Sequence, residues 1–403
     1  MSSKSGAKQS YLDDHGLSTV INASGTMTAL GASRVSPSAI AAMAEIMPEF
    51  IRMTDLQRAA NRVIRRATGA EAGCVTACAA SGISISVAGC MTGTDHAAIE
   101  RLPDTTDLRN EIPIQMGHLV SYGASIKQTI ELAGAKCVPV GEVTGAGAYQ
   151  LAGTITDDTA AAVYVVSHHT VQSGLISLED FIRICHDRSV PVIVDAASEY
   201  DLRGFLETGA DLVVYSGHKF LGGPTSGIIA GRKDLVRAAY FQERGIGRCM
   251  KVGKEGVLGA IVALEEWDKR DARAIAEAER ERVEYALTRL AQIAGLYPER
   301  SPDPTGNPIV RLKVSVDPGK AGLSAFDLSQ ALAEATPPIQ VRGHHVDRGY
   351  FFLDPCNLRH GEMEKVCDTI SDIVSSPGKH VSKHTTENLM DLRVKGLEKW
   401  PEE

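Results

Sequence analysis

The chain has 403 residues, 43% of them hydrophobic, and a net charge of −8 from 42 Lys and Arg against 50 Asp and Glu. A chain of this length can bury enough apolar surface for one large domain and a smaller one. The acidic balance, without a dense basic run, argues against a nucleic-acid partner. No run of about 18 apolar residues predicts a membrane span, and the first ten residues lack the apolar run of a secretory signal.

The eight cysteines are scattered without the paired spacing of a metal site. We therefore expect free thiols, no metal and a cytoplasmic protein.

The middle of the sequence alternates short apolar runs with helix-like segments, the pattern of an open α/β sheet. A strand at 73–77 leads through CAASG into a helix at about 83–91. AAAVYVVS and VPVIVD are unbroken apolar runs, as expected of strands buried on both faces. Helices are expected at 124–133 and 178–187, and further strands at 136–141, 160–167, 190–195, 211–217 and 226–231.

A helix-rich segment follows at 254–293, and the pattern changes after PDPTG. PIVRLKVSV, IQVRG and GYFFLD alternate with helices at 325–334 and 361–374, which indicates a compact α+β unit. We predict an N-terminal arm (1–20), a large domain (21–265), a connecting helix (266–300), a small domain (301–376) and a polar tail (377–403).

The strongest local pattern is SGHKFLGGPTSG, in which Lys219 directly follows a buried strand in a Ser- and Gly-rich turn. A lysine that forms a Schiff base with a cofactor aldehyde needs this setting, because small neighbours let the cofactor approach the backbone. Asp195 ends the preceding strand, where ligands bind in open α/β sheets. A carboxylate there can hold the ring nitrogen of pyridoxal-5′-phosphate (PLP) protonated; the alternative is a helix cap.

A third element is TACAASGIS, a small-residue turn that enters a helix. Free backbone N–H groups at a helix start, together with a hydroxyl, suit a phosphate. We select Ser81 and Gly82 as its candidates.

These motifs resemble the selenocysteine-synthase-like branch of fold-type I PLP enzymes, and within it the D-glucosaminate-6-phosphate ammonia-lyase group. The resemblance also rests on VINASGTMTALGASRVS, HLVSYGA, SHHTVQSGLISLEDF and GIGRCMKVGKEGVLGAIVALEEW, and it spans about residues 20–267. It implies an aspartate-aminotransferase-like large domain with a mostly parallel seven-stranded sheet, a small C-terminal α+β domain, and active sites at a homodimer interface.

Transferred residue by residue, the resemblance implies that Lys219 is the Schiff-base lysine and that Asp195 binds the pyridine nitrogen. It assigns Ser216 to the phosphate with Ser81 and Gly82, and His118 to the cofactor ring. Arg248 and Lys254 resemble a basic stretch near the active site, and we include Arg248 among the cofactor contacts, although both cations also fit an ordinary charged helix start.

The sequence departs from the selenocysteine synthases at two points. Those enzymes carry an added N-terminal domain that helps to bind transfer RNA, whereas the cofactor fold here begins by residue 20. Their stretch before the lysine usually reads SGD, whereas this chain has SGH, so we include His218 among the cofactor contacts. The absence of that added domain and the acidic net charge argue against an aminoacyl-RNA substrate.

The reaction depends on groups around the lysine, which is well placed to take the substrate Cα proton. His168, His169 and Gln172 follow a strand at the ligand edge of the sheet, and His345 follows another strand. We select His169 as the acid for a leaving group, and His168, Gln172 and His345 as substrate contacts. Any of these histidines can be the acid, and paired histidines at a strand end can also be structural. Arg359 is the first candidate for the substrate carboxylate, with Arg342 and Arg348 as alternatives.

The leading hypothesis is an α,β-eliminating lyase that acts on a small hydroxylated or sugar-derived amino acid, D-configured acids included, and releases a 2-oxo acid and ammonia. The alternatives are a racemase, an aldolase or an aminotransferase that uses the same Lys219 and Asp195.

Overall fold

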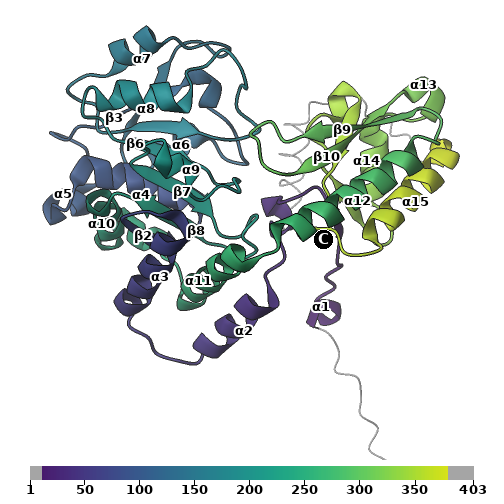
Figure 1. Ribbon diagram of the computed structural model, residues 1–403, viewed down its shortest axis with the longest axis horizontal. Coiled ribbons are helices and arrows are strands. Elements are labelled where there is room, and N and C mark those ends of the chain that lie inside the picture. The colour runs from purple at the N-terminus through teal and green to yellow at the C-terminus, as the bar shows by residue number, and fades with distance from the viewer. Residues whose placement is uncertain (1–10, 380–403) are drawn as a thin grey trace, which may run out of the picture. The chain divides into compact units, whose positions relative to one another are not determined.

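The computed structural model describes residues 11–379, which divide into two compact units (Figure 1). The large unit comprises Gly31–Arg270 and Pro304–Asn307. The small unit comprises the chain up to Leu30, Asp271–Asp303 and the chain from Pro308.

The large unit is built on a seven-stranded sheet with the order β2-β8-β7-β6-β5-β3-β4. The pairs from β7 to β4 are parallel, and β8 is antiparallel to both β2 and β7. The predicted mostly parallel seven-stranded sheet is therefore confirmed. Its strands are β2 (Ala72–Thr76), β3 (Glu111–Gln115), β4 (Lys136–Val140), β5 (Ala162–Val165), β6 (Val192–Asp195), β7 (Leu212–Ser216) and β8 (Gly227–Gly231).

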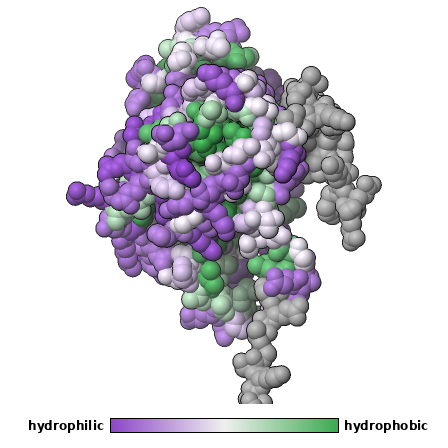
Figure 2. Space-filling view, turned by 90° about the vertical axis from the view of Figure 1, so that its right-hand side faces the viewer, coloured by the Kyte–Doolittle hydropathy of each residue, from purple (hydrophilic) through white to green (hydrophobic). Residues whose placement is uncertain are grey.

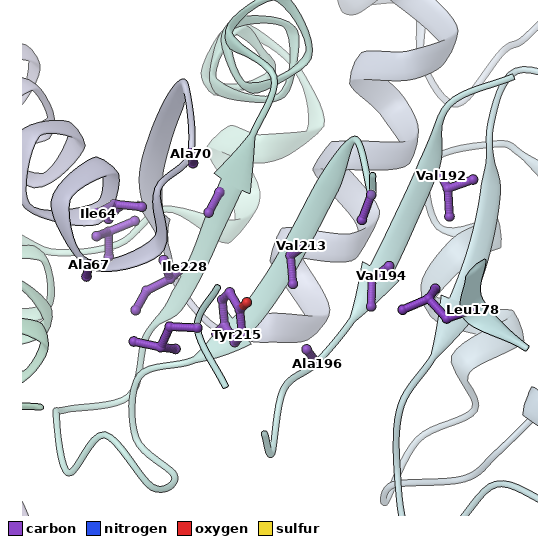
Figure 3. Packing of buried hydrophobic residues seen from close by; sticks show 14 of the residues in the cluster. Ile64, Ala67, Ala70, Leu178, Val192, Val194, Ala196, Val213, Tyr215 and Ile228 are labelled. Atoms are coloured by element: carbon purple, nitrogen blue, oxygen red, sulfur yellow. The ribbon is translucent and has the colours of Figure 1, made fainter. Parts of the chain in front are cut away.

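Helices cover both faces of this sheet, because alternate side chains of each buried strand point to opposite faces. On one face, Val194 and Val213 belong to a core that also receives Ile64 of α3 (Figure 3). On the other face, Ile193 and Val214 pack with α4. The helices are α2 (Pro37–Ile46), α3 (Met53–Thr68), α4 (Ala79–Thr92), α5 (His96–Arg101), α6 (Ile126–Glu131), α7 (Ala148–Thr154), α8 (Leu178–His186), α9 (Gly204–Glu207), α10 (Lys233–Phe241) and α11 (Lys254–Lys269).

The small unit has its own hydrophobic core and two small sheets. Strand β10 pairs antiparallel with β9 and β12, and β1 pairs parallel with β11. The strands are β1 (Ile21–Ala23), β9 (Leu296–Pro302), β10 (Val310–Val316), β11 (Ile339–Val341) and β12 (Tyr350–Leu353). The helices are α1 (Tyr11–Asp14), α12 (Ala272–Leu290), α13 (Pro318–Ala321), α14 (Ala325–Ala333) and α15 (Glu362–Ser375).

The boundaries of the units differ from the predicted domains, and Pro304–Asn307, predicted in the small domain, clusters with the large unit. Residues 21–30, assigned from the sequence to the large domain, cluster with the small unit because β1 pairs with β11. The predicted connecting helix is two helices, α11 and α12, and α12 contributes Val283 and Leu290 to the small core. Most of the predicted polar tail and half of the N-terminal arm lie outside the described residues.

The sequence patterns did not predict β1, β3 and β9. Strand β1 has only three residues, and β3 and β9 contain proline and charged residues. No helix among residues 11–379 is long and apolar enough to cross a membrane. Figure 2 shows one face of the molecule, which is largely hydrophilic with small hydrophobic areas.

Candidate active site

Lys219 lies in the turn after β7, and its Nζ donates a hydrogen bond of 2.6 Å to the Ser198 Oγ. Ser198 belongs to the turn after β6, the neighbouring parallel strand. The carboxyl ends of β6 and β7 therefore bring together two side chains that are 21 residues apart. This is the sheet edge at which open α/β folds bind ligands.

Asp195, the last residue of β6, is a buried carboxylate close to this lysine. Burial raises the pKa of Asp195, while the Lys219 ammonium and the Ala197 N–H lower it. The Oδ1 accepts the Ala197 N–H at 3.1 Å, and Oδ2 has no hydrogen-bond donor among residues 11–379. Asp195 is thus a buried acid with an open oxygen, an arrangement that suits a cationic partner.

His218, next to the lysine, is held by hydrogen bonds. Its Nδ1 lies 3.0 Å from the Ser216 Oγ, and its carbonyl accepts from the Ser33 Oγ at 2.7 Å. Burial and the neighbouring Lys219 charge lower the pKa of His218, so the imidazole is neutral near pH 7. The Ser216 hydroxyl and the His218 ring therefore form one polar unit beside the lysine.

The predicted phosphate turn is the N-terminus of α4. Ser81 binds back to Cys78, because its Oγ accepts the Cys78 N–H at 3.0 Å and donates to the Cys78 carbonyl at 2.8 Å. The Gly82 N–H also binds the Cys78 carbonyl, and a Cβ on Gly82 would lie 2.8 Å from Val214. Gly82 is thus explained by helix–sheet packing, and its contact with a phosphate stays a prediction.

The first two amides of α4, those of Ala79 and Ala80, have no acceptor within residues 11–379. They point out of the helix N-terminus with its partial positive charge, as an anion site requires. Gly227 closes the turn, since a Cβ there would lie 2.2 Å from the Cys78 carbonyl. Ser81 organises this turn, and the amides before it are the free donors.

His118 is buried, with a side chain engaged by its neighbours in the large unit. Its Nδ1 accepts the Val165 N–H at 3.2 Å, and its ring lies edge-on to Tyr164 with centroids 4.5 Å apart. Burial lowers the pKa of His118 to about 4. The predicted ring contact of His118 stays untested, and these contacts give it a structural role at the end of β5.

Tyr122, four residues further in the same HLVSYGA motif, is a second aromatic candidate for that contact. Its side chain is 39% exposed, and its hydroxyl hydrogen-bonds Thr129 of α6. Burial raises the pKa of Tyr122, and so do the nearby Asp195 and Cys78. Tyr122 is therefore near enough to Asp195 and Cys78 to feel their charge, which makes it a candidate for contact with a cofactor ring.

The predicted loop residues after β5 lie beside a cavity of about 490 Å³. The rings of His168 and His169 are 3.9 Å apart, and the Gln172 Nε2 donates to the carbonyls of Ser167 and Thr170. Gln172 lines the cavity, whereas the two histidines do not. His118 also lines it, but Lys219 and Asp195 do not, so this cavity adjoins the lysine site without containing it.

The predicted carboxylate-binding arginines belong to the small unit, described here by itself. Arg359 and Arg348 are exposed, and the Arg359 N–H donates to Glu362. Arg342 is buried, with its Nη1 3.7 Å from the Asp354 Oδ2. His345 packs on Tyr350 at 5.0 Å between centroids, and burial lowers its pKa. Their roles toward a substrate stay predictions.

The two cations of the GRCMKVGKE stretch lie on the surface of the large unit. Arg248 is exposed in a short 3-10 helix (Ile246–Met250). Lys254 begins α11, and its Nζ donates to the Glu49 carbonyl and lies 6.0 Å from the centre of the Phe50 ring.

Sequence reasoning missed Ser198 and Tyr122. Ser198 stands three residues after Asp195 in VDAASE, so its distance from the strand end was a usable signal. Tyr122 lies within a quoted motif, but only the fold shows which of its two rings lies near Asp195.

These residues fit PLP on observations of this chain alone. A lysine amine stands beside a buried acid with an open oxygen, and free helix-start amides and a neutral Ser216–His218 pair are available for a phosphate. The fold and the site define a fold-type I enzyme architecture.

The comparisons place the chain in a family. The sequence model of the L-seryl-tRNA selenium transferase family matches residues 20–275, and the chain belongs to this family. It is 39% identical to D-glucosaminate-6-phosphate ammonia lyase of Salmonella typhimurium over 358 residues, 89% of this chain and 96% of the relative. It is equally 39% identical to 5'-C-glycyluridine monooxygenase-decarboxylase of a Streptomyces species over 365 residues, 90% of this chain and 92% of the relative.

The solved structures agree with the fold. The structure of D-glucosaminate-6-phosphate ammonia-lyase matches with a TM-score of 0.83 and 37% identity, over 92% of this chain and 99% of that one. Aspartate aminotransferase from Thermus thermophilus matches with a TM-score of 0.55 and 15% identity, over 90% of this chain and 93% of that one, which shows the shared fold. The resemblance drawn from the sequence motifs is confirmed.

Proposed function

We propose that this protein is a PLP-dependent lyase that eliminates across the Cα–Cβ bond of a small hydroxylated or sugar-derived amino acid, D-configured acids included. The observation that carries the proposal is the Lys219 amine, which hydrogen-bonds Ser198 in the turn that follows the buried Asp195. The similarity to an ammonia lyase along almost its whole length supports elimination as the reaction.

Bound PLP supplies an electron sink for a carbanion at Cα. Asp195 would hold the pyridine nitrogen protonated, and the Ala79 and Ala80 amides with Ser216 and His218 would hold the phosphate. Lys219, once its amine is released, takes the Cα proton. Ser198 accepts the amine in the free protein and keeps it at this position.

The leaving group on Cβ needs an acid, and His169 remains our candidate, with His168 as the alternative and Gln172 as a substrate contact. All three lie in the loop after β5, whose neighbour β6 ends at Asp195. Arg359 would bind the substrate carboxylate from the small unit. Racemase, aldolase and aminotransferase reactions use the same lysine and acid, so they are the alternatives to test.

The monooxygenase-decarboxylase relative, at equal identity, supplies a further alternative. Oxidative decarboxylation of an amino acid consumes O₂ and releases CO₂, whereas elimination requires neither. Measuring O₂ uptake and CO₂ release therefore distinguishes the two reactions, in addition to their organic products.

The experiment begins with purified protein supplied with PLP, alongside Lys219→Ala. Lysine-bound PLP absorbs at about 410–430 nm, and this band should be present in the wild type and lost in the variant. A screen of D- and L-amino acids, including D-glucosaminate with and without its 6-phosphate, then follows ammonia, 2-oxo acid, O₂ and CO₂.

Equal release of ammonia and 2-oxo acid, without an amino acceptor and without O₂ uptake, is the expected result. Chiral inversion alone, acceptor-dependent turnover, or O₂ uptake with CO₂ release would replace the lyase by one of the alternatives. A wild type without the absorption band would refute the cofactor and the reaction together.

We also propose a homodimer, or a larger even assembly, in the cytoplasm. Five apolar side chains between α2 and the start of α3 are exposed by 37–103%, which is unusual for a surface that stays in water. They are Ile40, Met47, Phe50, Ile51 and Met53.

Lys254 packs at this apolar segment, which fits the prediction that its basic stretch lies near a subunit interface. Light scattering of the wild type and of Phe50→Asp tests this proposal. We expect the wild type to be a dimer and Phe50→Asp to be a monomer, because the new charge would lie in the interface. A monomeric wild type would refute the proposal.

A further inference from the structure

A four-residue segment, Pro304–Asn307, stands apart from its neighbours in the chain. It follows β9 and precedes β10, two paired strands of the small unit, yet its own contacts assign it to the large unit. We call Pro304–Asn307 the strap. Its contacts lie on the turn that follows Asp195.

Asn307 binds this turn on both sides of Glu199. Its Oδ1 accepts the Tyr200 N–H at 2.9 Å, and its Nδ2 lies 3.4 Å from the Ser198 carbonyl. Thr305 adds a third contact, since its Oγ1 lies 3.2 Å from the Oε1 of Glu199, which is only 7% exposed. Three consecutive residues of the turn are thus held by the strap.

The other side of the turn is held by the sheet. The Ser216 N–H of β7 donates to the Ala197 carbonyl at 3.3 Å, and the Ala197 N–H binds Asp195. Ser198 is therefore fixed between a strand and the strap, and its hydroxyl accepts the Lys219 amine at 2.6 Å.

A second contact runs through the ring of Tyr200. This ring packs on Phe220, the residue after Lys219, with centroids 4.1 Å apart, and on Trp267 at 5.3 Å. Asn307 thus fixes the Tyr200 backbone, and the Tyr200 ring packs against the lysine turn. Both sides of the Lys219–Ser198 hydrogen bond depend on the strap.

The geometry points to Asn307 as a positioning residue: through the turn 198–200 it holds Ser198, and Ser198 holds the reactive amine of Lys219. This inference rests on the proposed role of Lys219 as the reactive lysine. The contacts of Asn307 with the Tyr200 N–H and the Ser198 carbonyl are the route by which it acts.

The test measures the reactivity of the Lys219 amine in cofactor-free protein. Trinitrobenzenesulfonate modifies free amines, and peptide mass spectrometry gives the modification rate of Lys219 itself. The variants are Ser198→Ala, Ser198→Thr, Asn307→Ala and the double variant Ser198→Ala/Asn307→Ala. Asn110→Ala is the matched control, because Asn110 is also half-buried and makes a local hydrogen bond, to Thr105, elsewhere in the large unit.

Ser198→Ala should raise the modification rate of Lys219 about three- to tenfold, the equivalent of one hydrogen bond, and Ser198→Thr should stay near the wild type. Asn307→Ala should raise it in the same direction, and the double variant should react no faster than Ser198→Ala, because both changes release the same contact. Asn110→Ala should leave the rate unchanged.

An Asn307→Ala rate equal to that of the control would overturn the inference. So would a double variant whose effect is the product of the single effects, since Asn307 would then act independently of Ser198. Thermal unfolding by circular dichroism identifies a variant that has merely lost its fold. Failure of the proposed function is distinct, because it appears as a wild type without the absorption band of lysine-bound PLP.

Discussion

Glu279 of α12 gives the most quantitative prediction for the small unit. Its side chain is buried, and burial together with the nearby Asp354 raises its pKa to about 7. In the unfolded chain an exposed glutamate has a pKa of about 4.3. Between about pH 4.3 and about pH 7, Glu279 is therefore protonated in the folded protein but ionised in the unfolded chain, and the unfolding free energy falls as the pH rises through this range.

The magnitude follows from the difference between the two pKa values. At about 1.4 kcal/mol per unit, ionised Glu279 costs on the order of 3 kcal/mol at about pH 8 and less than about 1 kcal/mol at about pH 5. Glu279→Gln removes this titration and keeps the shape of the side chain. The difference in unfolding free energy between variant and wild type should thus be about 2 kcal/mol more favourable to the variant at about pH 8 than at about pH 5.

Urea unfolding followed by circular dichroism at both pH values measures this difference. Glu281→Gln is the matched control, because Glu281 is exposed on the same helix. The control should show no pH-dependent gain. If Glu279→Gln differed from the wild type by the same unfolding free energy at both pH values, a raised pKa of Glu279 would be refuted.

The remaining predictions concern buried groups in both units. Burial lowers the pKa of His118 to about 4, so the wild type should lose stability as the pH falls from about 6.5 to 4. His118→Asn keeps an acceptor for the Val165 N–H but cannot titrate. In urea unfolding, the variant should therefore not show this pH dependence of the unfolding free energy. Arg311→Met leaves the buried carboxylates of Asp303 and Asp354 without their close partner, at 2.6 and 2.7 Å, and should lower the unfolding free energy by about 3–5 kcal/mol; a loss below about 1 kcal/mol would contradict this. Gly89→Ala places a Cβ 2.7 Å from the Ala239 amide nitrogen and should cost about 1–3 kcal/mol in the same assay, whereas Gly153→Ala, with nothing within 4 Å, should cost nothing.

The sequence by itself determined the sheet and its ligand edge. Unbroken apolar runs such as VPVIVD can be buried only on both faces of a sheet, and a lysine and an aspartate at the ends of two such runs must meet at one edge. The order of turn, acid and lysine, with the motifs around it, was sufficient to predict the family. Periodicity could not find β3 and β9, whose short, mixed sequences become strands through pairing with their neighbours.

The tertiary structure alone decided which polar groups surround the lysine. The place of Ser198 after Asp195 hints at a role, but its contact with Lys219 appears only in the fold. Asn307 has no distinguishing local pattern, because its role depends on a turn 107 residues earlier in the chain. Only the fold shows that Gly82, a predicted phosphate contact, also packs against Val214. Local sequence sets which chemical groups are present and at which strand ends they stand, whereas long-range packing sets which of them touch.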